Sequence, residues 1–313
     1  MTARPLIASV LALFLFAPPS SSGATKKRPT PAPAAPKKKK PTPTPTATAP
    51  KARPTPAAPS DDGDIPLAAR GAMLIEAFSG KSLYEKNADT RFYPASTTKI
   101  MTGLLIIEAG DLDATVEVTE EDARVGESSL SIRPGQSYTR RQMLYGLMLK
   151  SANDVAHALG RDNGGTAEAF AAKMTQRARE LGCTNTSFMN PHGLHHPSHY
   201  TSPRDLALIA RAAMSQPLFR QIVATQQAPW TAPTGTFMLS NHNRLLQRFP
   251  GCNGVKTGYT IPAQQVLASS AARAGREAIA VVMHTDKPGI WEDSAKLLEF
   301  GLKQSADTVA TER

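Results

Sequence analysis

The chain has 313 residues, 41% of them apolar, and a formal net charge of +10, so it is long enough to bury a sizeable core. The charge is unevenly distributed: Arg4 and nine basic residues between positions 25 and 60 account for all of it, and residues 61–313 are neutral overall. A neutral folded region offers no evident basic face, and we therefore expect no nucleic-acid partner.

The first 24 residues predict a signal peptide. They hold one charged residue, Arg4, followed by a 12-residue apolar run from Leu6 to Ala17. This run is shorter than the roughly 20 residues that a membrane-spanning helix needs, and Ser22-Gly23-Ala24 supplies the small residues that precede a cleavage site. We expect export to the periplasm or to the extracellular side of the cytoplasmic membrane.

Residues 25–63 predict a disordered linker. Eleven prolines lie between positions 25 and 60, interleaved with Lys, Thr and Ala. This composition forms no core and favours an extended, semi-rigid spacer. The alternative is that this basic tail binds anionic envelope polymers or the membrane surface.

Residues 64–313 are expected to form the folded domain. Strand-like runs occupy residues 68–77, 82–85, 265–272 and 277–284. Apolar periodicity predicts helices at 96–109, 141–149, 155–159, 167–181, 202–213 and 291–303. The order of these strands and helices along the chain indicates an α+β fold, in which strands from both ends share one mainly antiparallel sheet and flank a helical subdomain.

Cysteines and histidines give no firm sign of a disulfide or a metal. Cys183 and Cys252 are compatible with pairing in an exported protein, but the sequence does not show whether they come within bonding range. Four histidines cluster in one predicted loop: His192, His195, His196 and His199. This loop spacing makes them poor zinc ligands, and no cysteine or carboxylate lies among them. We expect no metal and no cofactor.

One serine and one lysine carry the first sign of chemistry. Ser96-Thr97-Thr98-Lys99 is the only Ser-x-x-Lys in the chain. Three residues is nearly one helical turn, so both side chains are expected on one face, where the lysine amine can take the serine proton. A free lysine is no base at neutral pH, but burial, a helix N-terminus and a second ammonium each disfavour its charged form. Alone, the pattern also fits an exposed helix face.

Two further motifs follow in order along the chain. Ser151-Ala152-Asn153 is the only Ser-x-Asn, and Lys256-Thr257-Gly258 lies about one hundred residues later. Each has a plain structural interpretation, a helix cap for the first and a turn with a solvated charge for the second.

Together the three motifs resemble the active-site set of penicillin-binding proteins and serine β-lactamases. Over roughly residues 65–303 the chain resembles the low-molecular-weight D-Ala-D-Ala carboxypeptidases, serine peptidases of the S11 type. The resemblance rests on four stretches: Tyr93-Pro94-Ala95-Ser96-Thr97-Thr98-Lys99-Ile100-Met101-Thr102, Lys150-Ser151-Ala152-Asn153-Asp154, Asn190-Pro191-His192-Gly193-Leu194 and Gly254-Val255-Lys256-Thr257-Gly258-Tyr259-Thr260.

The resemblance implies a β-lactamase/transpeptidase-like fold and a serine D-alanyl-D-alanine carboxypeptidase that trims peptidoglycan stem peptides. Ser96 would attack the penultimate D-alanine, Lys99 would take the serine proton, and Ser151 would relay a proton to the leaving amine. Asn153 would bind the substrate amide, and Lys256 and Thr257 its terminal carboxylate, beside Gly258 and Tyr259. Backbone amides of Ser96 and Tyr259 would form the oxyanion hole. β-Lactams would acylate Ser96 as covalent inhibitors.

The chain departs from the family pattern twice. Ile261-Pro262 replaces a small residue and glycine after Thr260, and His284-Thr285-Asp286 replaces a glycine and arginine near the last strand. The second change predicts that carboxylate recognition depends more heavily on Lys256 and Thr257.

Three other functions use some of the same residues. A class A β-lactamase needs a deacylating glutamate, and none lies between Glu180 and Glu277. A DD-endopeptidase uses the same serine to cut cross-links between two peptides, and this alternative stays open at the level of sequence. A non-catalytic peptidoglycan-binding envelope protein is disfavoured by the intact motif residues.

Overall fold

The computed structural model describes residues 65–304. The predicted signal peptide, linker and last nine residues lie outside the described residues, as does the predicted domain boundary at residue 64. None of the helices in the described part is long and apolar enough to cross a membrane.

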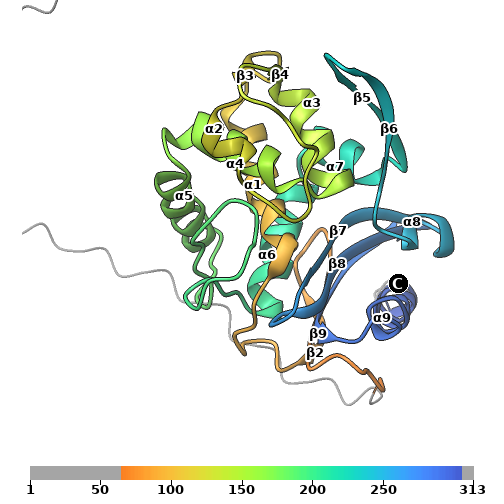
Figure 1. Cartoon of the computed structure of the whole chain (residues 1–313). Coiled ribbons are helices and arrows are strands. Elements are labelled where there is room, and N and C mark those ends of the chain that lie inside the picture. The colour runs from red at the N-terminus through yellow and green to blue at the C-terminus, as the bar shows by residue number, and fades with distance from the viewer. Residues whose placement is uncertain (1–64, 305–313) are drawn as a thin grey trace, which may run out of the picture. The chain divides into compact units, whose positions relative to one another are not determined.

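A five-stranded antiparallel sheet joins the two ends of the described region, as predicted (Figure 1). Its order is β2-β1-β9-β8-β7. The N-terminal part supplies β1 (Gly71–Glu76) and β2 (Ser82–Lys86). The C-terminal part supplies the other three strands, β7 (Cys252–Thr260), β8 (Gln264–Arg273) and β9 (Arg276–Thr285).

Both faces of the central strands are buried, because helices cover each side. Along β1, Met73 and Ile75 join the larger core, while Ala72 and Leu74 join the smaller one. This alternation follows from the two-residue period of a strand. The smaller core lies under α9 (Gly289–Gln304), and the larger one under the helical subdomain (Figure 1).

The helical subdomain is built around α1 (Lys99–Ala109), which buries eight of its eleven residues. A helix that is apolar on almost every side belongs in a core. The remaining elements are η1 (Ala95–Thr98), β3 (Thr115–Glu117), α2 (Glu120–Ala123), β4 (Ser137–Thr139), α3 (Arg140–Tyr145), the π-helical turn η2 (Gly146–Lys150), α4 (Asn153–Gly164), α5 (Ala167–Glu180), α6 (Pro203–Met214), α7 (Pro217–Ala224), β5 (Gln227–Ala232), β6 (Gly235–Ser240) and α8 (Leu245–Arg248).

Several elements differ from the sequence-based expectation. The helix expected to start at Ser96 begins as the 3₁₀ turn η1, and the one expected over 141–149 ends in a π-helical turn. The β5–β6 hairpin was not predicted, because one of its strands holds a proline and the other is largely exposed.

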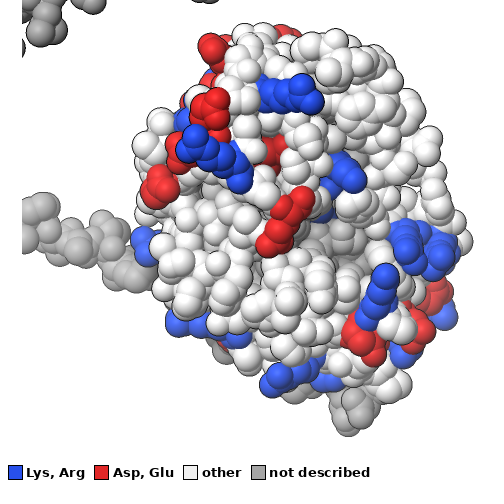
Figure 2. Space-filling model, in the orientation of Figure 1, with Lys and Arg blue, Asp and Glu red and all other residues white. Residues whose placement is uncertain are grey.

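Charged side chains of both signs are interspersed on the face shown in Figure 2. Both cysteines carry free thiols. Within residues 65–304, no group of three or more His, Cys, Asp or Glu side chains is placed to hold a metal ion.

Candidate active site

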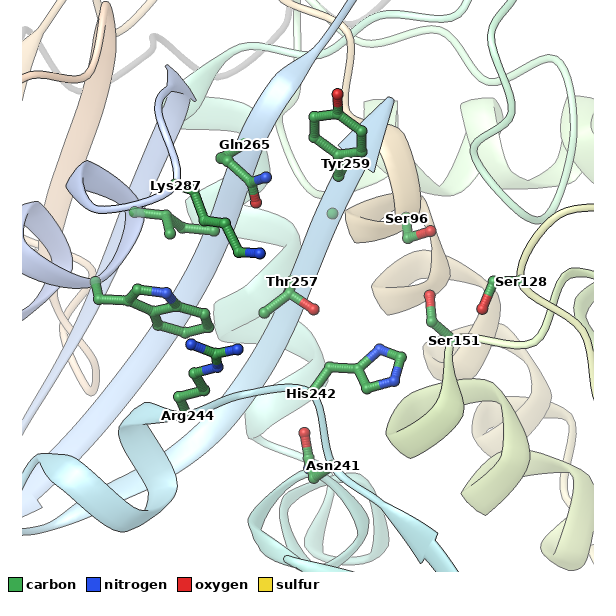
Figure 3. Close-up of a pocket in the computed structure, with 13 residues that line it drawn as sticks. Ser96, Ser128, Ser151, Asn241, His242, Arg244, Thr257, Tyr259, Gln265 and Lys287 are labelled. Atoms are coloured by element: carbon green, nitrogen blue, oxygen red, sulfur yellow. The ribbon is translucent and has the colours of Figure 1, made fainter. Parts of the chain in front are cut away.

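Five of the eight predicted site residues line one cavity of about 510 Å³ between the helical subdomain and the sheet (Figure 3). These are Ser96, Ser151, Thr257, Gly258 and Tyr259. The other three, Lys99, Asn153 and Lys256, are buried behind this lining. The structure thus brings together three motifs that are up to 160 positions apart in the sequence.

Ser96 is presented by a strained turn. The preceding Ala95 adopts φ +48°, in the left-handed region that a residue with a Cβ rarely occupies. Thr97 stabilises the turn, since its Oγ1 donates to the carbonyl of Pro94 over 2.7 Å. Figure 3 shows the hydroxyls of Ser96, Ser128 and Ser151 on the same side of the cavity.

The amine of Lys99 has three oxygen neighbours. Nζ lies 3.1 Å from Ser96 Oγ, 2.7 Å from Asn153 Oδ1 and 2.6 Å from the carbonyl oxygen of His192. The last two oxygens can only accept hydrogen bonds. A neutral amine has two N–H groups for these acceptors, which leaves its lone pair for the hydroxyl proton of Ser96.

Burial holds the pKa of Lys99 well below its ordinary 10.5, and the ammonium of Lys256 adds to this effect. Asp154 and Glu127 act in the opposite direction. The lowered pKa increases the share of Lys99 that is a neutral amine, the form that can take a proton. The hydrogen-bond geometry favours the same form.

The side chain of Asn153 hydrogen-bonds to other groups of the protein. Its Oδ1 accepts from Lys99, and its Nδ2 donates to the carbonyl of Gly126 over 3.0 Å. It does not line the cavity, so in this structure it holds Lys99 in place. Its expected hydrogen bond to the substrate amide remains a prediction.

Ser151 follows the π-helical turn and has φ +65°. This left-handed residue reverses the chain between η2 and α4, and its side chain faces the cavity (Figure 3). Behind it, Asp154 accepts hydrogen bonds from Ser129 Oγ at 2.6 Å and from the backbone amides of Leu130 and Ile132. This network fixes the segment that places Ser128 on the cavity wall.

The third motif lies within strand β7, not in a turn with a solvated charge. Lys256 is 1% exposed, and its Nζ donates to the carbonyl oxygen of Thr257 over 2.9 Å. Burial lowers the pKa of Lys256 to about 7. A Cβ added to Gly258 would lie 3.0 Å from the backbone nitrogens of Ser96 and Thr97, so glycine allows the strand to run against the nucleophile turn.

The segment 190–194 closes the site from behind. Gly193 has φ +92°, and a Cβ there would lie 1.9 Å from the carbonyl oxygen of Ala95. The neighbouring carbonyl of Pro191 accepts from Thr102 Oγ1 over 2.6 Å. His192 and His199 are buried, and burial lowers their pKa to about 2 and about 3. His192 supplies its backbone carbonyl, not its ring, to Lys99.

Sequence reasoning missed eight residues of the cavity lining. None belongs to a recognised motif, and they come from four separate parts of the chain, so no local pattern could have revealed them. They are Ser128, Asn241, His242, Arg244, Gln265, Lys287, Ile290 and Trp291. Burial and the charge of Lys256 lower the pKa of His242 to about 4, which leaves its ring neutral at pH 7.

Known proteins are similar to this chain in sequence and fold. A family model described as D-alanyl-D-alanine carboxypeptidase, Peptidase S11, matches residues 55–287. DacF of Bacillus subtilis, a D-alanyl-D-alanine carboxypeptidase, is 40% identical over 75% of this chain, which spans 62% of that protein. DacB2 of Mycobacterium tuberculosis, also a D-alanyl-D-alanine carboxypeptidase, is 35% identical over 80% of this chain and 86% of its own length.

Solved structures agree with the sequence comparisons. An R248L mutant of the Streptomyces K15 DD-transpeptidase superposes with a TM-score of 0.72 at 34% identity, covering 77% of this chain and 100% of that one. A D-alanyl-D-alanine carboxypeptidase from Mycobacterium tuberculosis gives a TM-score of 0.73 at 35% identity, covering 77% of this chain and 95% of that one. The fold is therefore the α+β fold of these enzymes, and the chain belongs to the Peptidase S11 family of D-alanyl-D-alanine carboxypeptidases.

Proposed function

We propose that the protein is a serine D-alanyl-D-alanine carboxypeptidase that removes the terminal D-alanine of peptidoglycan stem peptides. The observation that carries this proposal is the buried amine of Lys99, 3.1 Å from the hydroxyl of Ser96 at the wall of the cavity. The names of the relatives DacF and DacB2 support the same activity.

In the acylation step, Ser96 Oγ attacks the carbonyl carbon of the penultimate D-alanine while Lys99 takes the hydroxyl proton. The peptide bond to the last D-alanine breaks, and Ser151 relays a proton to the departing amine. An ester between Ser96 and the shortened peptide remains. Backbone amides of Ser96 and Tyr259 are proposed to stabilise the oxyanion, since Gly258 brings this strand close to the turn.

In the second step, water attacks the ester, releases the peptide as a carboxylic acid and restores Ser96. A β-lactam presents a strained amide to the same serine, so we propose that it forms a covalent ester at Ser96. Thr257, on the cavity wall, is proposed to bind the substrate carboxylate.

We also propose that the protein acts outside the cytoplasmic membrane. The short apolar run from Leu6 to Ala17 supports export, because peptidoglycan lies outside the cytoplasmic membrane. The basic, proline-rich composition of residues 25–63 supports a spacer between the apolar run and the catalytic domain. We propose anionic envelope polymers or the membrane surface as the partner of this basic segment.

Digestion of purified muropeptides by the full chain tests the activity, with Ser96→Ala as the control. We expect mass spectrometry to show loss of one D-alanine from pentapeptide monomers, and no loss with the variant. Conversion of cross-linked dimers to monomers with pentapeptides untouched would instead establish a DD-endopeptidase. Equal products with and without Ser96 would refute serine catalysis.

A further inference from the structure

One end of the cavity carries an exposed aromatic ring. Figure 3 shows Tyr259 and Arg244 on opposite sides of Thr257. Tyr259 lines the cavity and is 53% exposed, and Gln265, its partner in the antiparallel β7–β8 pair, also lines it. Residues directly opposite each other in such a pair share one face of the sheet. Tyr259 and Gln265 therefore present an aromatic ring and an uncharged amide together on the cavity side.

Ile261 follows Tyr259 by two positions, in the turn between β7 and β8, and is 78% exposed. An isoleucine with so much of its surface in water contributes little to the stability of the fold. The pair Ile261-Pro262 is also one of the two departures from the family pattern, at a place where a small residue and glycine are expected. This exposed position thus carries a large apolar side chain that packing of the domain does not explain.

The turn that carries Ile261 is held in one conformation. Its carbonyl accepts from Gln264 Nε2 over 2.6 Å, and the amide of Ala263 donates to Thr260 Oγ1 over 3.3 Å. Ala263 is 1% exposed, and the ring of Pro262 fixes its own φ. A turn that is already ordered loses little freedom when a ligand binds, which favours its use as a contact surface.

The proposed acylation geometry directs a substrate peptide toward these two side chains. In that geometry the terminal carboxylate lies at Thr257, and the carbonyl oxygen of the bond attacked by Ser96 lies at the backbone amide of Tyr259. The residue before D-Ala-D-Ala lies on the other side of the attacked carbonyl from the carboxylate, and so it leaves the nucleophile on the Tyr259 side. An extended residue advances by about 3.3 Å, which brings its side chain within reach of Tyr259 and Ile261.

We infer that Tyr259 and Ile261 form an apolar subsite for the side chain of the residue that precedes D-Ala-D-Ala, and that they select a long aliphatic chain there. This inference rests on the proposed function and deepens it. No carboxylate is among the described residues that line the cavity, so an ammonium at the end of that chain finds no ion-pair partner in the lining. The subsite therefore recognises the methylene groups of the chain and not a terminal charge.

The test compares two acetylated tripeptides, X-D-Ala-D-Ala, in which X is alanine or norleucine. Both side chains are uncharged, and norleucine has three more carbon atoms. The full chain is assayed by release of D-alanine, and the kcat/KM for norleucine divided by that for alanine gives the preference. A fully buried methylene group contributes about fourfold, and an open surface that covers half of it contributes about twofold. We therefore expect a wild-type preference of about tenfold.

Variants of the turn test which side chains carry the preference. Ile261→Ser should reduce it by about twofold to fourfold, whereas Ile261→Leu, which keeps the apolar area, should retain it. Ile261→Ser combined with Tyr259→Ser should bring the ratio close to 1, while the backbone amide at position 259 remains. Phe78→Ser is the matched control, because Phe78 is 66% exposed in the turn between β1 and β2, on the opposite side of the same sheet. It should keep the wild-type ratio.

A second readout does not depend on turnover. Penicillins with short or long aliphatic acyl side chains are compared by the rate at which they form a covalent adduct, followed by the mass of the intact protein. The acyl group of a penicillin takes the place of the residue before D-Ala-D-Ala. We therefore expect a preference for the long chain, and a loss of this preference in Ile261→Ser.

The outcomes separate the two proposals. D-alanine release with a wild-type ratio near 1, or with a ratio that Ile261→Ser and the double variant leave unchanged, would overturn the subsite and leave the carboxypeptidase intact. If adducts form without D-alanine release, the penicillin rates decide on the subsite in the same way. Absence of both D-alanine release and adduct formation in the wild type would overturn the two proposals together. A preference that falls in Ile261→Ser but not in Ile261→Leu or Phe78→Ser supports the subsite.

Discussion

Replacing Asn153 by aspartate should disable the proposed base while changing almost no volume. The substitution puts a carboxylate where a neutral amide oxygen now accepts from Lys99. At an effective dielectric of about 20, two unit charges 2.7 Å apart attract by about 6 kcal/mol, equivalent to about 4 pH units. Desolvation of the new carboxylate offsets part of this attraction.

The direction in which the pH–rate profile moves follows from the role of the Lys99 amine. Acylation needs neutral Lys99, so its rate rises with pH through the pKa of that group. A carboxylate at position 153 favours the ammonium and raises this pKa. We expect the acidic limb of the pH–rate profile to move up by about 2 to 4 units, with a rate below that of the wild type at every pH on this limb.

The assay is the pH dependence of the rate at which a β-lactam acylates Ser96, followed by the mass of the intact protein. Asn153→Ala is the control, since it also removes the acceptor but introduces no charge. Thermal unfolding of each variant shows whether the fold is retained after the contact with Gly126 changes. An Asn153→Asp profile whose acidic limb coincides with that of the wild type would refute the assignment of Lys99 as a neutral base.

Two further substitutions test the scaffold around the site. Gly193→Ala should lower the free energy of unfolding by about 2–4 kcal/mol, because its Cβ would lie 1.9 Å from the carbonyl oxygen of Ala95 and its φ is +92°; an unchanged melting temperature would contradict this. Burial opposes ionisation of Asp122, but hydrogen bonds from His157 and Arg161 outweigh it and hold the pKa of this carboxyl well below 3.8. Its ionised form therefore stabilises the fold above pH 3.8, and this contribution is lost as the pH falls through the lowered pKa. Asp122→Asn should accordingly be less stable than the wild type in urea at pH 7, with a difference that shrinks in strong acid.

Local patterns predicted the parts of the site that depend on local geometry. The three-residue spacing of Ser96 and Lys99 places the two groups 3.1 Å apart, as one helical turn requires. Four of the five strands of the sheet were predicted from their β-rich runs, and their pairing from their position at both ends of the domain, whereas β7 was not predicted.

Contacts between distant segments could not be predicted in this way. Lys256 looks like a solvated charge in the sequence, and only the packing of β7 shows that it is buried. Arg244 and Lys287 belong to no motif and reach the cavity because Asn243 and Asp286 anchor their backbones. Asn153 reaches Lys99 because α4 packs against α1, and its Oδ1 accepts from Nζ together with the carbonyl oxygen of His192.

The most direct test of Ser96 as the nucleophile and Lys99 as its base is to incubate the full chain with a penicillin and to locate the covalent adduct by peptide mapping. We expect one adduct per chain, on Ser96, its absence in Ser96→Ala and a strongly reduced rate in Lys99→Met. An adduct on another residue, or one that survives in Ser96→Ala, would contradict it.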